Sequence, residues 1–79
     1  MRKKTKQLVI TFSTTTAAMA MEKRAQEIGI FGRLIPLPSE ISAGCGLSWK
    51  TKPEEKEKIL VFLEEEKLKW EAMYELELY

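Results

Sequence analysis

Histidine is absent from this 79-residue chain, and cysteine occurs once, as Cys45. The missing histidine excludes a hydrolase built on a cysteine–histidine pair. It also argues against zinc, whose protein ligands are mainly cysteine and histidine. We therefore expect no metal and no cofactor. A single cysteine forms no disulfide within the chain, and this usage favours a reduced, cytoplasmic protein.

Long apolar runs and an excess of charge of one sign are also missing. The apolar runs are far shorter than the roughly 20 residues of a membrane-spanning helix, so no membrane role is expected. The chain carries 13 basic and 12 acidic residues, a net charge of +1, and so has no overall field that would attract nucleic acid. The basic residues of segment 1–6 are expected to form a solvated, flexible tail. We do not expect nucleic-acid binding, because no aromatic side chains are interleaved with them.

What the chain does contain is the pattern of one α+β domain over residues 1–79. Strands are predicted from β-branched and aromatic runs, and helices from apolar residues at helical spacing. The predicted order is a strand over 8–12, a helix over 17–28, a strand over 32–38, a strand over 45–50, a helix from about residue 53, and a final strand. Two prolines in segment 32–38 cannot donate ladder hydrogen bonds, which predicts an edge strand.

The limits of both helices have recognisable signals. Hydroxyl residues at 13–16 predict an N-cap for the first helix, and Gly29 its C-terminal end. Thr51 and Glu54 have capping-box spacing ahead of the second helix. The predicted core-facing residues are Ala18, Met21, Ala25 and Ile28 in the first helix, and Ile59, Leu60 and Leu63 in the second.

The C-terminal segment 70–79 is open to two interpretations. Its apolar and polar residues alternate with a period of two, which favours a strand. Its Glu, Lys, Leu and Ala content, without an intervening glycine, favours a continuation of the second helix. We favour the strand. The order is then β-α-β-β-α-β, the ferredoxin-like split β-α-β fold, with a four-stranded antiparallel sheet and two helices on one face.

This topology gives Cys45 a specific neighbourhood. The first strand ends at the rim of the sheet where the second strand turns into the third, so the loop before Cys45 and the start of the first helix should meet. Helix N-termini carry unpaired N–H groups and partial positive charge, which favour a thiolate. We predict a carrier thiol at Cys45 and an anion-binding surface at that rim, made of Ser13, Thr14, Thr15, Thr16, Gly44 and Gly46. Arg33 should lie at the opposite rim. The alternative is that Cys45 is a small buried apolar residue.

Four segments, residues 9–15, 20–22, 32–38 and 41–49, resemble the DUF3343 family of selenium/sulfur carrier-like proteins. The resemblance implies that Cys45 is the functional residue. It implies as partners a cysteine desulfurase or selenocysteine lyase and an acceptor enzyme. The family usually has an arginine where this chain has Ser39, so any contribution of that arginine to binding is missing.

We therefore predict a sulfur or selenium carrier that holds a persulfide or selenide on Cys45, and not an autonomous enzyme. A second interpretation is an interaction module in which Cys45 only packs. In that case an edge strand would bind a partner or form a homodimer. A third is a sensor of a small anion or a nucleotide-like ligand at the same rim, without covalent chemistry.

Overall fold

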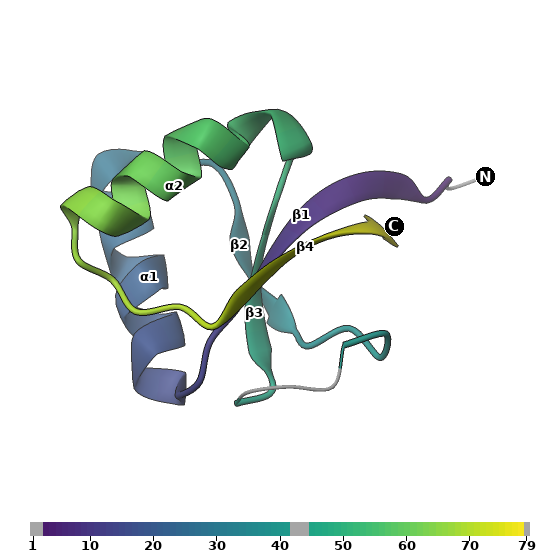
Figure 1. Cartoon of the computed structure of the whole chain (residues 1–79), viewed down its shortest axis with the longest axis horizontal. Helices are drawn as coiled ribbons and strands as arrows, with labels where there is room; N and C mark the ends of the chain where they lie inside the picture. The colour runs from purple at the N-terminus through teal and green to yellow at the C-terminus, as the bar shows by residue number, and fades with distance from the viewer. Residues whose placement is uncertain (1–2, 42–44, 79) are drawn as a thin grey trace.

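The computed structural model describes residues 3–41 and 45–78 (Figure 1). Short strands alternate with two helices along the chain. The elements are β1 (Thr5–Thr11), α1 (Thr15–Ile28), β2 (Arg33–Pro36), β3 (Leu47–Thr51), the short 3-10 helix η1 (Pro53–Glu55), α2 (Lys56–Glu65) and β4 (Ala72–Leu78). None of the helices in the described part of the chain is long and apolar enough to cross a membrane.

The four strands form one sheet in the order β2-β3-β1-β4, and every neighbouring pair is antiparallel. Ile10 in the centre of β1 lies opposite Trp49 of β3 on one side and Met73 of β4 on the other. This order and these directions confirm the predicted ferredoxin-like α+β fold. They also make β2 and β4 the edge strands, as predicted for the proline-containing segment. Dimerisation through an edge stays a prediction.

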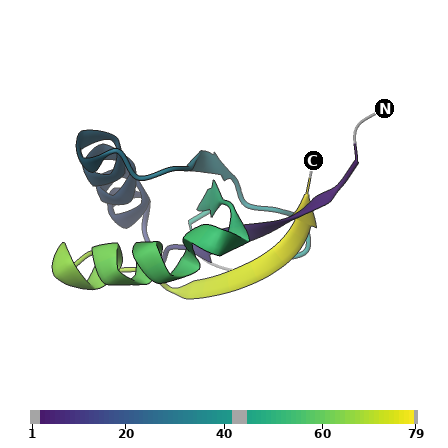
Figure 2. The same ribbon diagram turned by 90° about the horizontal axis from the view of Figure 1, so that it is seen from above.

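Both helices lie on the same side of the sheet, which Figure 2 shows from above. One apolar cluster fills the space between them and the sheet, and burying such side chains is the main stabilising contribution in a domain of this size. Its buried members are Ile10, Phe12, Ala18, Met21, Ala25, Trp49, Ile59, Phe62 and Leu63. The sheet side of the core is therefore formed mainly by the central strands β1 and β3.

The prediction for the helix faces is wrong at two positions. Ile28, in the last turn of α1, is 48% exposed, and Leu60 of α2 is 36% exposed. In α2 the buried residues are Ile59, Phe62 and Leu63, the i, i+3, i+4 set that faces one side of a helix. Leu60 falls beside this stripe and lines a surface hollow with Trp70.

Helix α1 begins and ends as predicted. Thr14 is its N-cap, and the Thr14 hydroxyl oxygen accepts a hydrogen bond from the Ala17 N–H at 3.1 Å. Gly29 closes the helix with φ 86°, a left-handed conformation that glycine adopts without steric cost. The chain therefore enters α1 from β1 through a short, hydroxyl-rich turn at residues 12–14.

The predicted capping box of the second helix is wrong. Thr51 is the last residue of β3, and its hydroxyl donates a 2.8 Å hydrogen bond to the carbonyl of Phe31, twenty residues earlier. The 3-10 helix η1 precedes α2. Lys52 is the N-cap of η1 and makes no side-chain capping hydrogen bond. The Thr51 hydroxyl thus fixes the segment before β2 instead of the start of the helix.

The N-terminal and C-terminal segments of the chain pair with each other as the strands β1 and β4. Strand β1 begins at Thr5, within the segment expected to be a tail, because Thr5 and Lys6 pair with Leu78 and Glu77 of β4. The C-terminal segment is the strand β4, as favoured. Lys67, with φ 53°, provides the left-handed turn after α2 that no glycine supplies.

Candidate functional site

Cys45 lies in the turn just before β3, beside the end of β1. Its backbone N–H donates a 3.2 Å hydrogen bond to the carbonyl of Phe12, the residue that follows β1. Phe12 is itself fully buried in the core, so this carbonyl is a fixed anchor. The hydrogen bond therefore places the backbone of Cys45 next to the turn that begins α1, as the predicted topology requires.

Cys45 is a free cysteine, and the residue is half-buried. Its side chain packs against the apolar cluster under the helices. The sulfur makes a weak hydrogen bond, 3.9 Å long, with the carbonyl of Leu47 two residues later. This contact directs the thiol toward the Leu47 carbonyl. The residue is also partly exposed to solvent.

The hydroxyl residues of the predicted anion-binding surface, Ser13, Thr14, Thr15 and Thr16, are all exposed. Thr14 uses its hydroxyl oxygen as the acceptor for the helix cap, which leaves its hydroxyl proton able to donate. Within the described residues, the thiol of Cys45 has its hydrogen bond with Leu47 and not with these hydroxyls. Among the described residues, the structure thus brings the two segments together through a backbone hydrogen bond and not through a hydrogen bond between the thiol and these hydroxyls.

Of the two glycines that flank Cys45 in the sequence, the structure describes one. Gly44 lies outside the described residues. Gly46 is exposed and has φ 86°, and a side chain at this position would find open space within 4 Å. The carbonyl of Gly46 accepts a 2.9 Å hydrogen bond from the N–H of Leu37. Gly46 therefore permits the turn after Cys45 and ties it to the chain leaving β2.

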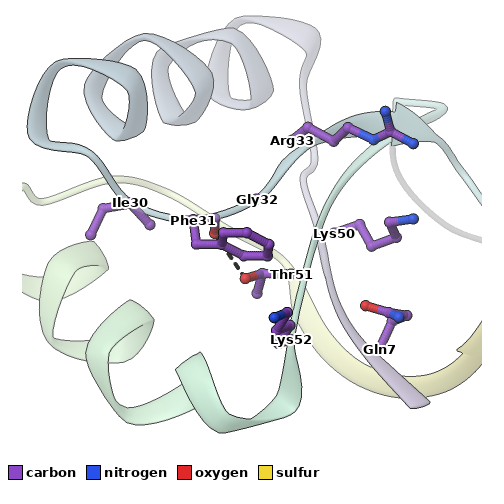
Figure 3. A pocket seen from close by; sticks show the side chains of 8 residues that line it. All are labelled: Gln7, Ile30, Phe31, Gly32, Arg33, Lys50, Thr51 and Lys52. Atoms are coloured by element: carbon purple, nitrogen blue, oxygen red, sulfur yellow. Dashed lines mark hydrogen bonds between the residues drawn. The ribbon is translucent and has the colours of Figure 1, made fainter. Parts of the chain in front are cut away.

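A second feature, not predicted from the sequence, lies at the opposite end of the β2–β3 pair (Figure 3). A cavity of about 580 Å³ is lined by Gln7, Ile30, Phe31, Gly32, Arg33, Lys50, Thr51 and Lys52. Three of these residues are basic and none is acidic. Arg33 is at this rim, as expected. The cavity depends on the strand register that places Arg33 opposite Lys50, and no sequence pattern indicated that register.

The described residues contain no group of three or more metal-ligating side chains. The candidate functional group is the one thiol of the chain, at a rim of a ferredoxin-like sheet beside a capped helix N-terminus. This fold and site define a class of small α+β domains with a single cysteine presented on a glycine-flanked turn.

The comparison with protein families gives the more specific assignment. Residues 7–75 match the family described as "Putative Se/S carrier protein-like". This match covers most of the chain and includes both Cys45 and the start of α1. The chain belongs to this family, as its resemblance to DUF3343 indicated. No curated protein and no solved structure gave a match.

Proposed function

We propose that the protein carries sulfur or selenium, held on Cys45 as a persulfide or as its selenium counterpart. The donor would be a cysteine desulfurase or a selenocysteine lyase, and the acceptor another enzyme of sulfur or selenium metabolism. The observation that carries the proposal is the hydrogen bond from the Cys45 N–H to the Phe12 carbonyl. It holds the only thiol of the chain at a rim, half exposed, beside the N-terminus of α1. Membership of the carrier-like family supports the same role.

The transfer is an exchange between sulfur atoms. The Cys45 thiolate attacks the outer sulfur of the donor's persulfide, an S–S bond to Cys45 forms, and the donor's own S–S bond breaks. The donor cysteine leaves as a thiolate, and the transferred sulfur keeps its proton, so no oxidant is consumed. With selenium as the outer atom the bonds change in the same way. A second exchange with the acceptor thiol returns Cys45 to its starting state.

The surroundings of Cys45 suit the anionic forms in this exchange. The Ala17 N–H of α1 is bound by the Thr14 hydroxyl, and the N–H groups before it lie at the positive end of the helix dipole, which stabilises an anion nearby. In our proposal the hydroxyls of Ser13, Thr14, Thr15 and Thr16, with the backbone at Gly44 and Gly46, hold the outer sulfur or selenium. The Thr14 side chain keeps this helix start in place through its cap.

The test is a loading reaction followed by intact-mass spectrometry. The protein is incubated with a cysteine desulfurase and cysteine, and in a parallel reaction with a selenocysteine lyase and selenocysteine. We expect the chain to gain the mass of one sulfur or one selenium atom, and a thiol reductant to remove it. Because the chain has one cysteine, the modified residue is identified without peptide mapping.

Cys45→Ser is the matched control, because it replaces one atom in a half-buried side chain. It should keep the far-ultraviolet circular dichroism of the parent protein and gain no mass. A folded parent protein that gains no mass in either reaction would contradict the carrier role. The interaction-module interpretation would then stand, since it needs no reactive thiol.

A further inference from the structure

The cavity at the rim opposite Cys45 combines positive charge with an exposed aromatic ring. We propose that it binds a small organic phosphate with a planar ring, the chemical class of the nucleotides. The phosphate would lie between Arg33 and Lys52, and the ring of the ligand against Phe31. This site is separate from the sulfur chemistry, and the proposal does not depend on the carrier role.

The charges of the cavity come from two neighbouring strands and the residue after them. Arg33 of β2 lies directly opposite Lys50 of β3 in the register of the sheet. Lys52 follows one residue after β3 and also lines the cavity. Arginine is suited to phosphate because its planar guanidinium can donate two parallel hydrogen bonds.

The aromatic part of the site is Phe31, whose side chain is 52% exposed. Phe31 has a fixed backbone, because its carbonyl accepts the 2.8 Å hydrogen bond from the Thr51 hydroxyl (Figure 3). The ammonium group of Lys52 lies 5.1 Å from the centre of the Phe31 ring, within cation–π distance. A large exposed aromatic ring beside cations is a favourable surface for a stacked base that carries a phosphate.

The cavity also has the size and polar groups that this class of ligand requires. Its volume of about 580 Å³ lies within the range of roughly 300–1,000 Å³ common for small-molecule sites. Gln7 lines the cavity from β1, and its amide can both donate to and accept from the edge of a base.

The test is titration with AMP, followed by the backbone amide signals of the folded protein in nuclear magnetic resonance. We expect saturable shifts at Gly32, Arg33, Lys50 and Lys52 with micromolar to millimolar affinity. Inorganic phosphate and adenosine, each with half of the proposed contacts, should bind about tenfold more weakly than AMP. Absence of shifts with millimolar AMP would overturn the proposal, and so would equal binding of AMP and inorganic phosphate.

Variants locate the site. Arg33→Ala and Lys52→Ala remove exposed side chains and should each weaken AMP binding about tenfold. Phe31→Leu should lower the affinity for AMP to that for inorganic phosphate. Lys23→Ala is the charge-matched control, because Lys23 is exposed on α1 outside the cavity. Equal loss of binding in the Lys23 variant would show a general charge effect and contradict the site.

Two further measurements separate this proposal from its alternatives. Cys45→Ser should bind AMP like the parent protein, because Cys45 is not among the lining residues. A hexaglutamate peptide should displace AMP only when the peptide concentration is higher than the AMP concentration. Displacement by the peptide at lower concentrations would mean that the cavity receives an acidic protein segment, and it would overturn the assignment to a nucleotide.

Discussion

At one end of the β2–β3 pair, Cys45 is held by its backbone to Phe12, and the neighbouring side chains at the start of α1 are neutral hydroxyl groups. At the other end, Arg33, Lys50 and Lys52 surround a cavity with an exposed phenylalanine ring. The first rim has a thiol and hydroxyl groups, and the second has basic side chains and an aromatic surface. The two rims differ although the same two strands lead to both.

The comparison shows how a domain with one small core can separate two kinds of surface. A single antiparallel pair has two ends, and each end places its own loop residues beside a different neighbour. At the Cys45 end the neighbour is the β1–α1 turn, and at the cavity end it is the segment between α1 and β2. A net charge of +1 conceals this difference, because three basic residues and no acidic residue line the cavity.

A glycine with positive φ lies beside each site, Gly32 at the cavity and Gly46 next to Cys45, and these two glycines should respond differently to the same substitution. The larger effect is expected for Gly32→Ala. Gly32 has φ 136°, and an added Cβ would clash with the indole of Trp49 and lie 2.6 Å from the carbonyl oxygen of Lys50. Backbone strain and overpacking together should lower the free energy of unfolding by about 3 kcal/mol. Urea denaturation measures this, and a loss similar to that of Gly46→Ala would contradict the account.

The smaller effect is expected for Gly46→Ala. An added Cβ meets open space at this position, and the cost is confined to the left-handed backbone at φ 86°. We expect a loss of about 1 kcal/mol in the free energy of unfolding, measured in the same urea experiment. Gly46→Asn is the matched control, because asparagine tolerates this conformation better than alanine. Asparagine should retain more stability than alanine, and the opposite order would show that the loss has another cause.

Much of the fold could be predicted from the sequence, because local signals agreed with the tertiary structure. The two-residue alternation predicted β4, and Thr14 and Gly29 fulfil the expected roles at the ends of α1. The wrong capping box shows where a distant segment decides. The Thr51 hydroxyl binds the carbonyl of Phe31, twenty residues away. No helix-capping pattern contains that information.

The candidate site was predictable to the same extent. Chain topology alone brings Cys45 to the end of β1, and the hydrogen bond to Phe12 agrees with that prediction. The direction of the thiol was not predictable, because it depends on the local turn that points it toward the Leu47 carbonyl. The cavity at the other rim required the strand register that aligns Arg33 with Lys50, which the predicted strand limits left undetermined.

The central claim is that Cys45 is a reactive residue at a rim and not a packing residue of the core. The most direct measurement is the rate at which iodoacetamide alkylates Cys45 at neutral pH, in the folded protein and in the same protein unfolded by urea. Thiolates near a helix N-terminus are more reactive, whereas buried structural cysteines are inert. The account predicts that the folded protein reacts at least as fast as the unfolded chain. A folded protein that resists alkylation while the unfolded chain reacts would contradict it.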